Sequence, residues 1–245
     1  TSRMAATCSA TGSPNRDYVY VHYAFSDAPV PRPRVNTPTR SRLSRFTMDR
    51  DTLVIDPGSE LVLIDQKDPS PWHQGGALFF GAEDGFLYLS VGDGGGSGCQ
   101  YENCQRIDKS LFAGVLRLDV DQRGGSVSHP IRRQPSNAST QGYYIPSDNP
   151  FVDSGLLEEF YALGLRSPHR MSQDAESRSV WIADVGQEGR EELDVLAPGA
   201  NYQWPMREGN ARYRGVVPDP TVGVWTDPLL ELAICGPVSL TAPTK

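Results

Sequence analysis

Two residues with acid–base chemistry stand at the open end of one predicted β-hairpin. His73 precedes an apolar run at 78–80, and Asp93 follows a second apolar run at 86–91. The Asp84-Gly85 pair between the runs predicts a tight turn, because glycine tolerates the positive φ that such a turn needs. The hairpin therefore brings His73 and Asp93 to one edge of a sheet, where a carboxylate-held histidine is a good general base near neutral pH. A surface histidine beside a glycine turn is the alternative.

The elements that must position this pair are short strands separated by turns. Few segments have helical periodicity, and aromatic and β-branched runs alternate with clusters of Gly, Pro, Asp and Asn, so we predict a mostly β chain. Residues 156–163 fit either a short helix or a strand. A ragged N-terminal end is expected at 1–16, a turn at 49–59, a long polar loop at 121–150 and an unpatterned tail at 233–245. Strands are predicted at 17–25, 41–48, 60–64, 78–80, 86–91, 111–120, 170–173, 180–185 and 192–196.

A small antiparallel unit recurs along the chain. Segments 79–92 and 171–186 each contain a strand, an Asp-containing turn, an aromatic-rich strand and a terminal glycine, and 17–25 is similar to the second half of this unit. Recurrence of such a unit predicts a β-propeller, in which each blade is a four-stranded sheet. We therefore predict an all-β fold with a partial β-propeller over residues 17–232. A β-sandwich is the alternative.

Composition argues against two kinds of partner. The net charge is −7 and no basic patch is dense enough to follow a phosphate backbone, so nucleic acid is not an expected partner. The chain has no run of 18 apolar residues, so no membrane span is predicted.

The cysteines indicate the redox environment. Cys99 and Cys104 flank a short turn in a glycine-rich loop, where a local disulfide would fit an oxidising compartment. A zinc site would need a second close pair of ligands, and the sequence offers none. Whether the two thiols pair is left open by the sequence. Asn137-Ala138-Ser139 is a glycosylation sequon, which has meaning only in a secreted eukaryotic protein.

Five segments in the same order resemble signatures of the soluble glucose/sorbosone dehydrogenase family, whose quinoprotein members use pyrroloquinoline quinone (PQQ). The resemblance covers roughly residues 17–215 and implies a six-bladed β-propeller with the cofactor over its central axis. The segments are 73–78 (His-Gln-Gly-Gly-Ala-Leu), 85–94, 164–168 (Gly-Leu-Arg-Ser-Pro), 181–187 with 191–194, and 201–205 (Asn-Tyr-Gln-Trp-Pro) followed by Glu208-Gly209.

The resemblance implies roles for three catalytic residues. His73 matches the base that removes the proton from the hydroxyl at C1 of the sugar, and Asp93 matches the carboxylate that orients this base. Arg166 matches the arginine beside the quinone carbonyl, where a fixed guanidinium stabilises the negative charge that develops during hydride transfer. A solvent-exposed loop arginine and a turn-capping aspartate are the structural alternatives for Arg166 and Asp93.

The resemblance also implies a set of ligands. For PQQ these are His73 and Arg166 together with Ser167 and Tyr213. The backbone carbonyls of Gly186 and Gln187 match those that hold a calcium ion against the cofactor. Glu192 and Tyr202 resemble a second, structural calcium site, although Glu192 also fits an exposed strand carboxylate, and Tyr202 and Trp204 fit core positions.

This chain departs from the family pattern in three places. Ser167 stands where sugar-oxidising members carry Asn. No Lys or Arg segment after Tyr213 matches the remaining basic cofactor ligands, and an earlier blade is missing before Asp17. The length of 245 residues accounts for about three to four blades, so we expect an incomplete arc that further sequence completes.

Two hypotheses of function follow. The first is a periplasmic or secreted quinoprotein dehydrogenase of carbohydrate metabolism, which oxidises an aldose at C1 to the lactone and passes electrons to an external acceptor. The second is a non-catalytic extracellular propeller that binds a protein, as in Hedgehog-interacting-protein-like members of the family. The sugar, the electron acceptor and the choice between monomer and homodimer stay open.

Overall fold

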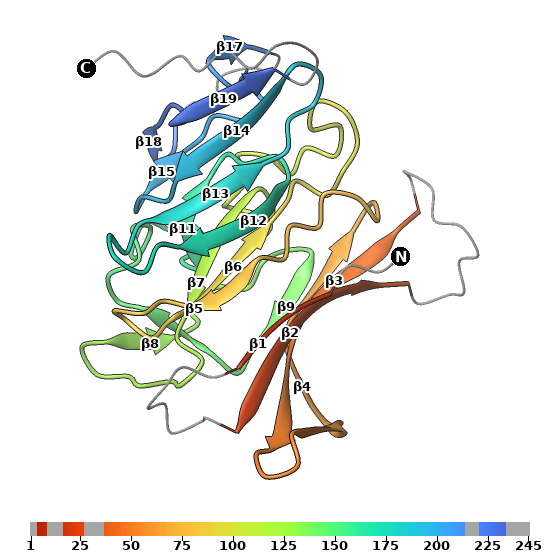
Figure 1. Ribbon diagram of the computed structural model, residues 1–245, viewed down its shortest axis with the longest axis vertical. Coiled ribbons are helices and arrows are strands. Elements are labelled where there is room, and N and C mark those ends of the chain that lie inside the picture. The colour runs from red at the N-terminus through yellow and green to blue at the C-terminus, as the bar shows by residue number, and fades with distance from the viewer. Residues whose placement is uncertain (1–3, 9–16, 27–36, 214–220, 234–245) are drawn as a thin grey trace.

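The computed structural model describes residues 4–8, 17–26, 37–213 and 221–233, and every regular element within these ranges is a β-strand. Most strands belong to three larger sheets, which begin one after another along the chain (Figure 1). Each larger sheet contains four strands paired in antiparallel order, as in a propeller blade. The predicted all-β class and the partial β-propeller are confirmed, and the described residues form an arc of three blades.

The first sheet has the strand order β1-β2-β3-β4-β9, and all its pairs are antiparallel. A long hairpin of β3 and β4 dominates this sheet, and the short strand β9 adds to its outer edge (Figure 1). The bounds are β1 (Met4–Cys8), β2 (Tyr18–Phe25), β3 (Thr39–Asp49), β4 (Val54–Asp68) and β9 (Ala138–Thr140).

The second sheet has the order β18-β15-β11-β7-β6-β5 and contains the hairpin predicted at 78–91. Its pairs from β5 to β11 are antiparallel, whereas β15 and β18 add in parallel. The bounds are β5 (Leu78–Phe80), β6 (Leu87–Val91), β7 (Gly114–Leu118), β11 (Phe160–Leu163), β15 (Ala200–Asn201) and β18 (Val224–Trp225).

The third sheet is the antiparallel series β12-β13-β14-β19. Its first hairpin, β12–β13, occupies the same place as β5–β6 in the second sheet, which confirms the repeat seen in the sequence. The bounds are β12 (Pro168–Gln173), β13 (Val180–Asp184), β14 (Arg190–Val195) and β19 (Leu230–Ala233); two small pairs are β8 (Ser128–Pro130) with β10 (Tyr144–Pro146), and β16 (Arg207–Glu208) with β17 (Ala211–Arg212).

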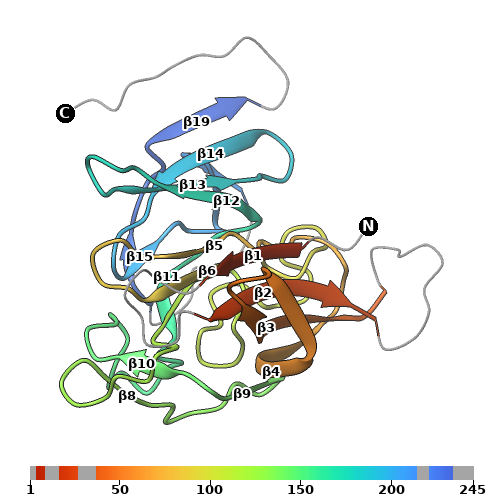
Figure 2. The same ribbon diagram turned by 60° about the horizontal axis from the view of Figure 1, so that its bottom comes forward.

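Two apolar cores lie on opposite faces of the second sheet, which sits between the other two (Figures 1 and 2). Along β6, Leu87 and Leu89 belong to the core shared with the first sheet, whereas Tyr88 belongs to the core shared with the third. Side chains of a strand alternate between its two faces, so a strand buried on both sides is apolar throughout. This explains why 86–91 is apolar at every position except Ser90.

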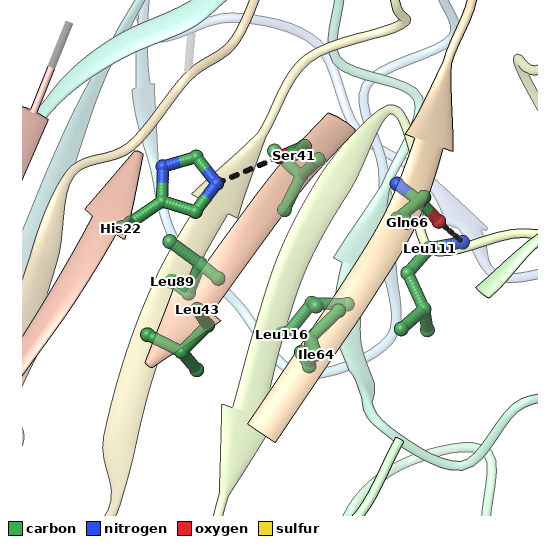
Figure 3. A pocket seen from close by; sticks show the side chains of 9 residues that line it. His22, Ser41, Leu43, Ile64, Gln66, Leu89, Leu111 and Leu116 are labelled. Atoms are coloured by element: carbon green, nitrogen blue, oxygen red, sulfur yellow. Dashed lines mark hydrogen bonds between the residues drawn. The ribbon is translucent and has the colours of Figure 1, made fainter. Parts of the chain in front are cut away.

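A small cavity remains between the first and second sheets (Figure 3). Its volume of about 10 Å³ is room for roughly one water molecule, so it is a packing gap and not a substrate site. His22 lines it and contacts the Ser41 hydroxyl through Nε2 at 2.9 Å. Burial lowers the pKa of His22 to about 4, so this imidazole is neutral at physiological pH.

The structure corrects several sequence predictions. Residues 4–8, expected in a ragged end, form β1 against β2, and β4 begins at Val54 inside the expected turn. The expected polar loop at 121–150 contains β8, β9 and β10. Of the two alternatives for 156–163, the structure confirms the strand, as β11. These strands are short or polar and exist because a distant neighbour supplies the pairing backbone. β19 ends at Ala233, and residues 234–245 of the expected tail lie outside the described residues.

Candidate active site

The proposed base and its carboxylate meet where β5 begins and β6 ends. His73 Nδ1 lies 2.6 Å from Asp93 Oδ1, and Asp93 is 1% exposed. The contact arises because residues 78–80 pair with 87–89, which sets the flanking loops side by side. The juxtaposition predicted from the hairpin is confirmed.

The backbone between these residues is unusually close. A Cβ on Gly92 would lie 1.8 Å from the carbonyl oxygen of His73 and 3.1 Å from that of Arg166, so only glycine fits. His73 itself has a φ of 54°, in the left-handed region that a residue with a side chain seldom adopts. Such conformations cluster at functional sites, where the surrounding structure holds them in place.

Neighbouring blades are joined at this same point. The Asp93 N–H donates to the Arg166 carbonyl at 2.9 Å, and the Ser90 hydroxyl donates to the Pro168 carbonyl at 2.9 Å. These two bonds connect the end of β6 to the start of β12. His73, Asp93 and Arg166, which are widely separated in the sequence, therefore converge on one end of the second and third sheets.

The Asp93 carboxylate has further donors. Its Oδ1 also accepts from the Gly95 N–H, and its Oδ2 accepts from the indole N–H of Trp204, both at 2.9 Å. An ionised carboxylate can only accept, so His73 Nδ1 must be the donor in their shared bond. The neutral imidazole then keeps its lone pair on Nε2, the nitrogen that a general base uses.

Arg166 meets this pair through its backbone carbonyl, which accepts from the Asp93 N–H, and the residue is 7% exposed. Its guanidinium donates to the Val185 carbonyl at 2.9 Å and to Gln187 Oε1 at 2.9 and 3.2 Å. Its Cζ lies 5.5 Å from the ring centre of Trp204, within the range of a cation–π contact. A cation is therefore held beside the indole that donates to Asp93, with its position set by Val185, Gln187 and Trp204.

Asp184, at the end of β13, holds the backbone that carries Arg166. Its two oxygens accept from the Arg166 N–H at 2.8 Å and from the Ser167 N–H at 2.6 Å. Burial raises the pKa of Asp184, and these two bonds partly oppose that effect. Ser167 is buried here, and its backbone N–H is the group that contacts Asp184.

The segment expected to bind calcium through carbonyl groups forms a tight turn over Glu208. The N–H groups of residues 187–190 all point at one carboxylate oxygen of Glu208, with the Gln187 N–H at 2.6 Å. Burial alone would raise the pKa of Glu208, but these four donors outweigh it and the pKa is lowered. The Gly186 N–H donates to Glu191.

The two residues expected at a second calcium site have separate partners. The Glu192 carboxylate accepts from the Gly209 N–H, whereas the Tyr202 hydroxyl donates to the Val195 carbonyl at 2.7 Å. Burial, and then the charge of Asp184, raise the pKa of Glu192, so it is not the exposed strand carboxylate of the alternative interpretation. Tyr202 is buried, in agreement with a core position.

Asp194 adds an unexpected feature beside Glu192. It is fully buried, and neither of its carboxylate oxygens has a hydrogen-bond partner. Burial, followed by the charges of Glu192 and Asp184, raises its pKa. Within the described ranges, however, no three His, Cys, Asp or Glu side chains are arranged to hold a metal ion.

Two further parts of the chain border the site. Tyr213 stacks on Trp204 with ring centres 5.2 Å apart, and its hydroxyl donates to Glu188 at 3.1 Å. Cys99 and Cys104 form a disulfide, as the oxidising alternative predicted. The loop that it closes places the Asn103 amide 3.1 Å from the Asp93 carbonyl.

Sequence reasoning missed Trp204 and Asp184. Trp204 was interpreted as a core residue, which its 3% exposure agrees with, but its indole N–H also contacts the proposed catalytic carboxylate. A tryptophan that is buried needs a hydrogen-bond acceptor, and this need was the available signal. Asp184 was passed over as a strand residue because its role is to accept from backbone groups.

Solved structures place this fold among the soluble aldose and glucose dehydrogenases. The chain superposes on the apo-form of the soluble aldose sugar dehydrogenase from Escherichia coli with a TM-score of 0.60 and 18% identity, covering 94% of this chain and 58% of that one. For the PQQ-bound aldose sugar dehydrogenase from Streptomyces coelicolor the TM-score is 0.54 and the identity 17%, over 94% of this chain and 72% of that one. At these identities the likeness concerns the fold.

The family model for glucose/sorbosone dehydrogenase matches residues 11–223. The chain belongs to the glucose/sorbosone dehydrogenase family, and the resemblance stated from the motifs is confirmed.

Curated relatives fall into two groups. The HIPL1 protein of Arabidopsis thaliana is 42% identical over 58% of this chain, and Hedgehog-interacting protein from Homo sapiens is 31% identical over 54% of it. The aldose sugar dehydrogenase YliI from Escherichia coli is 29% identical over 58% of it. The matches span only 20%, 17% and 32% of these three proteins, respectively. No helix among the described residues is long and apolar enough to cross a membrane.

Proposed function

We propose that this chain forms part of a PQQ-dependent dehydrogenase that oxidises an aldose at C1 to the lactone. The observation that carries the proposal is the 2.6 Å contact between His73 Nδ1 and Asp93 Oδ1, with the Arg166 guanidinium against the indole of Trp204, which donates to Asp93. A base with an oriented free nitrogen and a fixed cation in the same site suits the removal of a proton from a hydroxyl oxygen and of a hydride from its carbon.

His73 is the general base in this scheme. Its Nε2 takes the proton of the C1 hydroxyl while the carbon–hydrogen bond at C1 breaks with its electron pair. The imidazolium that forms is stabilised by the Asp93 carboxylate, which holds Nδ1–H throughout. Arg166 stabilises the negative charge that develops on the hydride acceptor. Bound PQQ and calcium would supply that hydride acceptor and a Lewis acid.

The residues present fit such a cofactor in charge. Arg166 is a buried cation suited to an anionic quinone, and the stacked rings of Trp204 and Tyr213 lie next to it. Carbonyl oxygens of Gly186 and Gln187 are the hard donors that calcium prefers. The unpartnered oxygens of Asp194, beside Glu192, suit a second calcium ion in the same way.

The disulfide agrees with the proposed compartment. Disulfides persist in periplasmic and extracellular proteins, so Cys99–Cys104 supports a periplasmic or secreted enzyme that passes electrons to an external acceptor.

Reconstitution tests the proposal. The full-length protein is titrated with PQQ in the presence of calcium, and dye reduction is then measured with a panel of aldoses. Turnover is expected in the wild type, and His73→Ala should lower kcat by about 10²- to 10⁴-fold. His129→Ala is the matched control, because His129 lies on β8 in the small β8–β10 pair and contacts no proposed site residue. Full turnover in His73→Ala would reject the assignment.

A second candidate is a propeller that binds a protein partner. The identities to HIPL1 and to Hedgehog-interacting protein favour it, as does the disulfide loop that borders the site. In that case the wild type would neither bind PQQ nor reduce dye, whereas the His73–Asp93 contact would persist. PQQ titration by calorimetry therefore separates the two candidates.

A further inference from the structure

Trp204 contacts both charged members of the candidate site. Its indole N–H donates to Asp93 Oδ2 at 2.9 Å, and the Arg166 guanidinium lies 5.5 Å from its ring centre. Asp93 and Trp204 are 111 residues apart, and the bond between them is buried. The Trp204 side chain thus contacts both the Asp93 carboxylate, which orients the base, and the Arg166 guanidinium.

The indole is held in place from several directions. The backbone N–H of Trp204 donates to the Gly164 carbonyl at 2.9 Å, two residues ahead of Arg166, and its backbone carbonyl accepts from the Gln105 side chain at 2.9 Å. Tyr213 stacks against the ring. The donor atom consequently has little freedom to follow a moving carboxylate, and it is the carboxylate that must adjust to the indole.

The two carboxylate oxygens of Asp93 accept hydrogen bonds from different donors. Oδ1 accepts from His73 and from the Gly95 N–H, while Oδ2 has Trp204 as its donor. Without the indole N–H, Oδ2 would be a buried acceptor with no partner and the carboxylate could rotate about its Cβ–Cγ bond. Rotation would move Oδ1 out of line with His73 Nδ1, and the imidazole would no longer be held in a single tautomer.

We propose that Trp204 is a positioning residue: its indole N–H sets the plane of the Asp93 carboxylate, and through it the tautomer of His73, while its ring supports Arg166. The significance for catalysis rests on the proposed function, whereas the effect on His73 does not.

The direct test is nuclear magnetic resonance of the histidine ring nitrogens in the full-length protein without cofactor. Trp204→Phe retains a ring for Tyr213 and Arg166 but removes the donor to Asp93. The wild type is expected to show His73 with the proton on Nδ1 alone, and the variant a mixture of both tautomers. Trp181→Phe, on β13 and away from Asp93, should match the wild type. An unchanged tautomer in Trp204→Phe would overturn the proposal.

Kinetics supply a second test in the reconstituted enzyme. Trp204→Phe should lower kcat by about 10- to 100-fold, because misplacing a catalytic group by a fraction of an ångström has effects of this size. KM should stay near the wild-type value, since the loss concerns the transition state. A rise in KM with unchanged kcat would also overturn the proposal. Absence of wild-type turnover alongside the tautomer shift would reject the proposed function and leave the role of Trp204 supported.

Discussion

Replacing Gly92 by alanine is the sharpest test of how the site is assembled. The new Cβ would lie 1.8 Å from the His73 carbonyl oxygen and 2.6 Å from its carbonyl carbon, whereas ordinary contact begins at 3.4 Å. The backbone would have to separate by about 1.6 Å at a point where His73 and Arg166 both approach. No flexible side chain can move away, because each neighbour is main chain.

The expected loss of stability follows from these contacts. Overpacking a tight site costs about 1–3 kcal/mol, and displacement of the Arg166 carbonyl adds about 1 kcal/mol for the weakened bond to the Asp93 N–H. We expect Gly92→Ala to lower the free energy of unfolding by about 3 kcal/mol. The variant should also lose the His73–Asp93 contact, since the two loops can no longer approach.

Urea unfolding of the full-length protein measures the effect. Gly189→Ala is a matched control, because its Cβ would meet nothing within 4 Å and its backbone needs no positive φ. The control should be within about 0.5 kcal/mol of the wild type. If Gly92→Ala is as stable as Gly189→Ala, the backbones of His73 and Arg166 do not converge on Gly92 and the site as described is wrong.

Three further predictions concern single contacts. Burial lowers the pKa of His22 from 6.5 to about 4, so the unfolded chain binds a proton more readily, and the free energy of unfolding should fall by about 3 kcal/mol as the pH drops from 6.5 to 4. In urea unfolding measured against pH, His22→Gln should show a flatter slope, and a slope equal to that of the wild type would contradict a neutral buried imidazole. Asp93→Asn leaves one acceptor oxygen for three donors, so kcat should fall by about 10²- to 10⁴-fold. The measurement is kcat with saturating aldose, and an unchanged kcat would exclude Asp93 from the mechanism. Replacing Cys99 and Cys104 by serine opens a short loop and should lower the free energy of unfolding, measured by denaturant titration, by about 2 kcal/mol. No loss would mean that neighbouring contacts hold the loop without the disulfide bond.

Much of the local structure followed from sequence pattern. The hairpin of β5 and β6 was predicted with its turn because two apolar runs and the Asp-Gly pair between them lie within a few residues of each other. The same reasoning found β12 and β13, and their recurrence indicated a propeller. It did not find β1, β8, β9 or β10, whose strands are too short or too polar to show a pattern of their own.

Only the part of the candidate site that depends on the pairing of neighbouring strands was predicted from sequence pattern. Contact between His73 and Asp93 follows from one hairpin. The bond from Asp93 to Arg166 joins two blades, and the bond from Trp204 spans 111 residues. Neither of these bonds produces a periodic pattern in the sequence, because each depends on how one sheet packs against the next. The family resemblance supplied Arg166, but it gave no reason to expect Trp204 in the site.

The sequence by itself determined the strand-and-turn chemistry, the histidine–aspartate hairpin and the family. Tertiary structure alone decided that Gly92 must be glycine, that the Asp93 carboxylate has its plane set by an indole, and that a guanidinium lies over the same ring. The physical reason is range: turn formation and side-chain alternation are set by neighbouring residues, whereas the orientation of a buried carboxylate is set by whichever donors the packed blades bring to it.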